Sequence, residues 1–144
     1  LVESSNNIGI LRCDKEEVTI TCSIRSSVGT LKEMMRDQMT VLAKAAHAQV
    51  RFENDYPEWA FSVDSPLRSK VVEVYQELYG KKPEIISIHA GLECGFFKAL
   101  YPDMDIISVG PNLTDVHTPR ERLEIASARR VYRWLLKLLA ALKE

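Results

Sequence analysis

The chain has 144 residues, of which 46% are apolar and 27% charged, and its formal net charge is -1. This composition is ordinary for a soluble globular protein, and the length suits one domain or two pieces of larger ones. The near-neutral charge and the even spread of Lys and Arg argue against nucleic acid or an anionic membrane as the main partner. No apolar run reaches the ~20 residues that a membrane span requires.

The first half of the chain has the pattern of a strand hairpin followed by a helix. In VTITCSIR (18–25) apolar and polar residues alternate strictly, and NIGILRC (7–13) precedes it across the polar turn DKEE. Residues 28–47 then carry apolar positions at helical spacing. QVRFE (49–53) is expected to be a further short strand. This order, with one polar sheet face, predicts an antiparallel or mixed α+β unit.

The second half alternates helices and apolar strands. After the turn-rich connector NDYPEWAFSVDSP, Ser65 and Pro66 are expected to open a helix that ends at Gly80. EIISIH (84–89) and DIISV (105–109) are expected to be buried strands on either side of a short helix at 92–100. Such an order predicts a parallel sheet covered on both faces. Two sets of apolar residues recur at steps of 4, 3 and 4, the first as a buried helical stripe and the second along the last helix: Leu67, Val71, Val74 and Leu78, and Val131, Leu135, Leu138 and Leu142.

The two expected parallel strands place two loops at one edge of the sheet. Ligands collect at the carboxyl ends of such strands, where HAGLECG and GPNLTDVHTP follow. Glu93 and His117 are therefore candidates for one small site.

Other readings of these loops stay open. Glu93 is explained equally well as a helix-dipole partner, and His117 as a loop histidine bonded to a backbone carbonyl. His89 fits a hydrogen-bonded histidine at the edge of the core. Thr118 and Glu121 have the spacing of a helix-capping box, which would start the last helix at Thr118. Cys94, at a helix start, would make a thiol hydrolase if His117 were its base.

Several motifs resemble a known enzyme family. HAGLECG, D-x-I-S-x-G-P and H-[ST]-P-x-E-R, all within residues 88–127, resemble the C-terminal part of the Xaa-His (aminoacyl-histidine) dipeptidases, which are carnosinase-like members of the dinuclear zinc exopeptidases. The similarity extends back to SSNNIGIL. The resemblance implies an α/β fold: part of a truncated catalytic domain at 58–144, with helices on both faces of a parallel or mixed sheet. It also implies part of an α+β ferredoxin-like lid, used for dimerisation, at 1–57.

The resemblance also assigns roles to individual residues. His117 would be a ligand of a two-zinc site, for which manganese or cobalt is also suited. Arg25 would grip the substrate carboxylate, Glu93 would receive the free amino group of a dipeptide, and Gly95 would allow close backbone approach to the substrate. Asn7 would add a polar contact. The family pattern starts the last helix near Ser127, with an extended segment before it.

The chain also departs from the family pattern. It has no His-x-Asp pair and no Glu-Glu pair with the rest of that site, so one metal ligand and no general base are recognised. The sequence also begins without Met, directly in strand-like residues. We therefore expect part of a metallodipeptidase that is inactive alone, needs a missing N-terminal portion, and forms a homodimer. The alternative is a non-catalytic assembly module that retains the peptidase fold.

The cysteines bear on location. Three cysteines at no metal-ligand spacing, without a signal peptide, favour a reducing, cytoplasmic setting over a disulfide framework.

Overall fold

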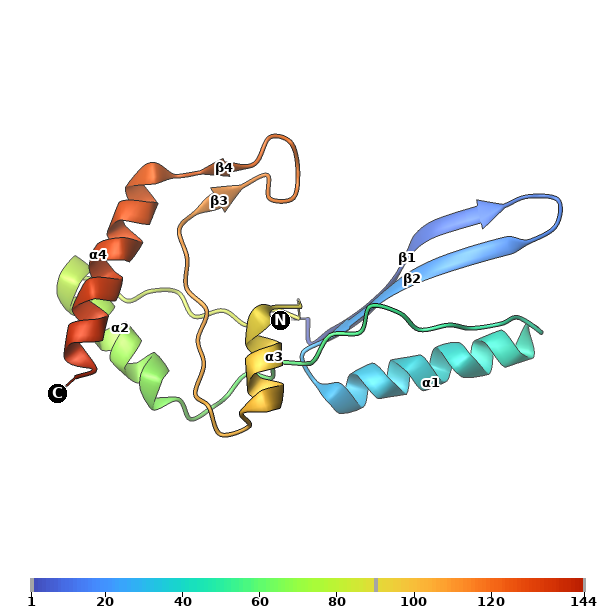
Figure 1. Ribbon diagram of the computed structural model, residues 1–144, viewed down its shortest axis with the longest axis horizontal. Helices are drawn as coiled ribbons and strands as arrows, with labels where there is room; N and C mark the ends of the chain where they lie inside the picture. Colours follow the sequence, from blue (N-terminus) through green and yellow to red (C-terminus); the bar gives the residue numbers. More distant parts are fainter. Residues whose placement is uncertain (1, 90, 144) are drawn as a thin grey trace. The chain divides into compact units, whose positions relative to one another are not determined.

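The computed structural model describes residues 2–89 and 91–143. Their contacts form two compact units: residues up to Ser62 with Ile86–Met104, and Val63–Ile85 with the residues from Asp105 onward. The elements in chain order (Figure 1) are β1 (Ser4–Cys13), β2 (Val18–Ser26), α1 (Gly29–Ala45), α2 (Pro66–Tyr79), α3 (Glu93–Leu100), β3 (Leu113–Thr114), β4 (Arg122–Leu123) and α4 (Ile125–Ala141). No helix within the described ranges is long and apolar enough to cross a lipid bilayer.

The first unit is built on the antiparallel hairpin β1–β2, which confirms the sequence prediction. Its turn forms because the Asp14 carboxylate accepts the backbone N–H groups of Glu16 and Glu17, at 2.8 and 2.9 Å. These two bonds lower the pKa of Asp14. α1 follows and contacts both strands. The predicted apolar strand face is half-buried at Cys22 and Ile24.

Residues 49–53 do not form the expected strand. No strand is assigned there, because the backbone of this segment joins neither of the two described sheets. Its aromatic side chain instead returns to α1, where the Arg36 guanidinium lies 4.7 Å from the centre of the Phe52 ring.

Lys32 ties the connector to α1. Its buried ammonium donates to Asp55 Oδ1 at 3.0 Å and to the Tyr56 carbonyl at 2.7 Å, and lies 3.5 Å from Glu58 Oε2. Burial by itself lowers the pKa of Lys32, but the hydrogen bonds and charges of Asp55 and Glu58 outweigh it and raise that pKa. The hydrogen bond from Lys32 in turn lowers the pKa of Asp55. Because each partner favours the charged form of the other, this ion pair stabilises the connector.

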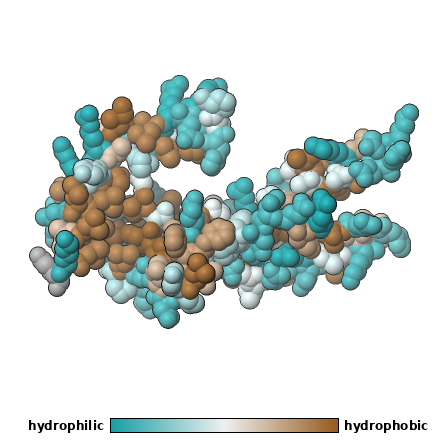
Figure 2. Space-filling model, in the orientation of Figure 1, coloured by the Kyte–Doolittle hydropathy of each residue, from teal (hydrophilic) through white to brown (hydrophobic). Residues whose placement is uncertain are grey.

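The second unit is built on α2 packed against α4. Val71 and Val74 of α2 meet Trp134 and Leu138 of α4 in a buried cluster. Figure 2 shows apolar side chains gathered over these two helices. Burying each such side chain contributes roughly 1.5–3 kcal/mol. The cluster therefore holds the pair of helices together.

The ends of α2 match their sequence signals. The Ser65 hydroxyl accepts the Arg68 N–H at 3.0 Å, and Gly80 closes the helix with φ 68°. The sequence did not reveal the role of Asp105. Its carboxylate accepts the Ser65 hydroxyl at 2.7 Å and the Leu67 N–H at 2.9 Å.

The predicted stripes of α2 and α4 are partly corrected. The outer positions Leu78 and Leu142 are 39% and 48% exposed, whereas Trp134 is only 5% exposed. The contact is centred on Trp134 and Leu138, one turn apart, because the indole also packs against the Tyr75 ring at 5.2 Å between ring centres.

The expected parallel sheet is not formed among residues 2–89 and 91–143. The described residues contain two sheets, β1–β2 and β3–β4, and both are antiparallel pairs. Segments 84–89 and 105–109 are assigned to no strand, because a ladder needs a neighbour and neither segment finds one among the described residues. Ile86 is accordingly 66% exposed. The mixture of helices and small sheets nonetheless agrees with the α/β class.

Candidate functional site

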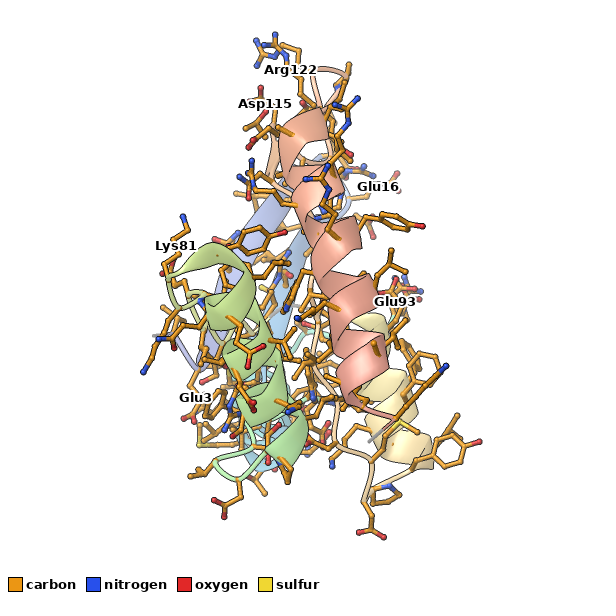
Figure 3. All side chains as sticks on the ribbon, turned by 90° about the vertical axis from the view of Figure 1, so that its left-hand side faces the viewer. Glu3, Glu16, Lys81, Glu93, Asp115 and Arg122 are labelled. Carbon is orange, nitrogen blue, oxygen red and sulfur yellow. The ribbon has the colours of Figure 1, made fainter. Side chains whose placement is uncertain are left out.

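His117 lies in the loop that joins β3 to β4 in the second unit. The strands pair at Leu113 with Leu123 and at Thr114 with Arg122, so residues 115–121 form the tip of a short hairpin. Figure 3 shows Asp115 and Arg122 at this end of the hairpin. The last helix begins at Ile125, later than Thr118, which agrees with the extended approach expected from the family resemblance and corrects the capping-box reading.

Two residues of this loop adopt left-handed backbone conformations that side chains disfavour. Asp115 has φ 52° and His117 has φ 65°. A left-handed conformation costs a non-glycine residue roughly 1–2 kcal/mol, and Asp and His tolerate it better than most residues. Local hydrogen bonds help to hold the tip in this shape.

Thr118 and Glu121 supply these hydrogen bonds. The Thr118 hydroxyl donates to the Asp115 carbonyl at 2.7 Å and accepts the Arg120 N–H at 3.1 Å. The Glu121 carboxylate accepts the backbone N–H of His117 at 2.9 Å. Both side chains that the capping-box reading assigned to a helix start are thus used inside the turn. This explains why the helix begins later.

The base of the hairpin is fastened to the start of α4. Asn112 donates its side-chain amide to Glu124 Oε2 at 2.8 Å, and its backbone N–H to the Ser127 hydroxyl at 2.9 Å. Arg130 donates to Glu124 Oε1 at 3.0 Å. The Asn112 bond, followed by Arg130, lowers the pKa of Glu124. The hairpin is therefore anchored by side chains at its base.

The exposed imidazole of His117 makes no hydrogen bond within the described residues, so the reading of a histidine bonded to a backbone carbonyl is not observed. A neutral imidazole on a fixed loop is a suitable metal ligand. The described residues contain no group of three or more His, Cys, Asp or Glu side chains placed to hold a metal. Zinc sites need about three protein ligands, so these residues fit one ligand and not a complete site.

Arg25 and Asn7 share one face of the β1–β2 hairpin in the first unit. Arg25 pairs with Ser5, and Asn7 with Ser23, and directly opposed residues of antiparallel strands project to the same side. The Ser5 hydroxyl lies 2.9 Å from Nε2 of His89, 84 residues away. The segment leading to α3 therefore lies against the face that carries Arg25 and Asn7. His89 is half-buried and hydrogen-bonded, as the sequence reading expected.

Glu93 occupies the first turn of α3, with its carboxylate exposed (Figure 3). A carboxylate is favourable there because of the helix dipole. Cys94 follows it and is half-buried. Whether Glu93 contacts a substrate stays a prediction.

Gly95 has a packing role that the sequence did not reveal. It is buried, and a Cβ atom placed on it would lie 2.5 Å from the Pro57 carbonyl oxygen. The connector therefore needs a glycine at this position whether or not substrate approaches. The expected contact of Gly95 with substrate stays a prediction.

Comparison with known proteins gives a consistent result. Residues 5–141 match the model of peptidase family M20/M25/M40. The chain is 40% identical over 139 residues to the cytosol non-specific dipeptidase of Escherichia coli K12, which covers 96% of this chain and 29% of the relative. The crystal structure of aminoacylhistidine dipeptidase from Vibrio alginolyticus superposes with a TM-score of 0.83 at 36% identity, over 98% of this chain and 29% of that one. The chain thus spans about three-tenths of the length of either relative.

Proposed function

The chain belongs to peptidase family M20/M25/M40, and on that premise we propose that it is part of a metal-dependent dipeptidase that hydrolyses Xaa-His and related dipeptides. The names of both relatives, each a dipeptidase, support this proposal. The observation that carries it is His117, which the anchored β3–β4 hairpin exposes at its tip and whose imidazole makes no hydrogen bond within the described residues. An exposed imidazole on an anchored loop is available to a metal supplied by the rest of the site.

His117 is the metal ligand that this chain contributes. It binds through one nitrogen of a neutral imidazole, which requires the ring to be deprotonated. The chemistry that a pair of zinc ions supplies, when bound, is polarisation of the scissile carbonyl and a lower pKa for a bound water. Manganese and cobalt suit the same ligand type. The remaining ligands and the general base are proposed to come from polypeptide outside this chain, so the chain alone is expected to be inactive.

The first unit contributes the proposed substrate contacts. Arg25, whose planar guanidinium offers two parallel donors, binds the C-terminal carboxylate of the dipeptide. Asn7, on the same strand face, adds a polar contact. Glu93 accepts the free amino group. The contact between Ser5 and His89 supports this grouping, because it places the segment before α3 against the Arg25 face.

The same proposal extends to assembly and location. Through its lid portion, residues 1–57, the protein is expected to form a homodimer. Sedimentation of the purified protein would test this. A cytoplasmic location agrees with three free cysteines and with the name of the Escherichia coli relative.

A segment exchange tests the proposal. The matching segment of the Escherichia coli dipeptidase is replaced by this chain, and dipeptide hydrolysis and bound zinc are measured. We expect an active, zinc-containing chimera that loses both properties on His117→Ala. The matched control is His47→Ala, since His47 is also exposed and left-handed, with φ 52°. A well-folded chimera without activity would favour the assembly-module alternative. Full activity with two zinc ions in the His117→Ala chimera would refute the ligand assignment.

A further inference from the structure

Glu121 makes two hydrogen bonds to the turn that carries His117, the proposed metal ligand. Its Oε2 accepts the backbone N–H of His117 itself, at 2.9 Å across four residues, while its own N–H donates to the Thr118 carbonyl at 3.1 Å. Glu121 therefore contacts the turn at two points, the N–H of His117 and the carbonyl of Thr118. Thr118 and Glu121, which have the spacing of a helix cap, thus stabilise the turn that contains His117.

The Glu121 carboxylate bonds to His117, the residue in the left-handed conformation. Histidine adopts the left-handed conformation more readily than most residues, but its Cβ still crowds the backbone there, so a hydrogen bond that holds this conformation raises its population in an exposed loop. The Thr118 bonds fix the carbonyl of Asp115 and the N–H of Arg120, which lie on either side of His117. Among the described residues, the carboxylate of Glu121 is the hydrogen-bond partner of the His117 N–H.

We propose that Glu121 is a positioning residue, which holds the backbone of His117 left-handed and so aims the imidazole at the metal. This inference rests on the proposed function, because it assumes that His117 binds a metal. Glu121 itself is not assigned as a ligand: one of its oxygens is used by the His117 N–H. Its effect is on how often the imidazole is presented in the binding geometry, and an apparent dissociation constant rises as that fraction falls.

The geometry separates positioning from folding. The whole turn is exposed, and so are Leu113 and Leu123 at the hairpin base. Without the Glu121 carboxylate, the His117 N–H can therefore hydrogen-bond to water. Loss of the carboxylate bond thus lowers the unfolding free energy only slightly. Metal affinity, in contrast, depends directly on the ring being held in place.

The variants Glu121→Ala, Glu121→Gln and His117→Ala are compared in the complete protein that carries this chain. Glu77→Ala is the control, because Glu77 is exposed on α2 and outside the hairpin. Zinc affinity is measured by competition with a chromogenic chelator, and the melting temperature is measured on metal-free protein. We expect Glu121→Ala to bind zinc roughly tenfold more weakly, which corresponds to about 1.4 kcal/mol. Glu121→Gln retains an acceptor oxygen and is expected to restore most of the affinity. The metal-free melting temperatures are expected to agree with that of Glu77→Ala.

The outcomes separate the positioning role of Glu121 from the metal-binding role of His117. If His117→Ala loses zinc while Glu121→Ala binds it like the wild type, the positioning role is refuted and the proposed function stands. The positioning role is also refuted if Glu121→Gln is as weak as Glu121→Ala, or if Glu121→Ala lowers the metal-free melting temperature as strongly as it lowers affinity. If His117→Ala keeps full zinc affinity, the metal assignment fails and the positioning role fails with it.

Discussion

Replacing Gly95 by alanine is expected to destabilise the protein, although alanine is the better helix former. The added Cβ would lie 2.5 Å from the Pro57 carbonyl oxygen and 3.3 Å from the carbonyl carbon. Both are backbone atoms, so the contact is relieved only by moving α3 or the connector. Forcing extra volume into a packed site costs roughly 1–3 kcal/mol. The gain in helix propensity offsets at most about 1 kcal/mol of this. The net expectation is a loss of up to about 2 kcal/mol.

Urea denaturation of Gly95→Ala and of the control Gly9→Ala measures this difference. A Cβ atom on Gly9 would meet the Thr21 carbonyl oxygen at 3.8 Å, an ordinary contact, so that variant is expected to keep or slightly raise the midpoint. Gly95→Ala is expected to lower the midpoint with an unchanged slope. An unchanged midpoint combined with a raised KM would refute the packing argument. It would show that Gly95 serves the approach of substrate alone.

Three further predictions concern the caps, the ion pair and the substrate. Asp105→Ala removes both acceptor bonds at the start of α2 and is expected to cost about 1–2 kcal/mol in urea denaturation, whereas Ser69→Ala is expected to change little. The pKa of Asp55 is lowered by folding, so its contribution to stability is complete above its ordinary pKa of 3.8 and is lost as pH falls through the folded value. The pKa of Lys32 is raised by folding, so its contribution to stability is complete below pH 10.5 and is lost as pH rises through the folded value. A Lys32→Met variant that keeps the wild-type pH dependence of the unfolding free energy would contradict this prediction. Arg25→Met is expected to raise KM for dipeptides by roughly ten- to a hundredfold with little change in stability. The reason is that a charge-assisted hydrogen bond contributes about 1.5–3 kcal/mol. An unchanged KM would exclude Arg25 as the residue that binds the substrate carboxylate.

Local signals predicted the elements whose hydrogen bonds close over short distances. The alternation of VTITCSIR predicted β2, and the Ser65, Pro66 and Gly80 signals predicted both ends of α2. These succeed because a hairpin register and a helix cap depend on residues a few positions apart. The ion pair of the buried Lys32 with the exposed Asp55 and the contact of Ser5 with His89 span 23 and 84 residues, and no spacing rule encodes them.

The errors have equally specific causes. Thr118 and Glu121 satisfy the pattern of a helix cap, but the same donors and acceptors also close a turn, and only the fold decides between the two uses. Segments 84–89 and 105–109 have strand composition, but composition does not provide a neighbouring strand. The family resemblance performed better at the start of α4, because it carried information about the tertiary structure of relatives.

The position of bound metal relative to His117 decides whether this residue is a metal ligand. Crystals of the complete protein grown with zinc give an anomalous difference map at the zinc absorption edge. We expect a peak about 2.0–2.1 Å from one ring nitrogen of His117, with the Glu121 carboxylate still bound to the N–H of that residue. A fully occupied zinc site with the His117 ring away from it would show that His117 is not a metal ligand.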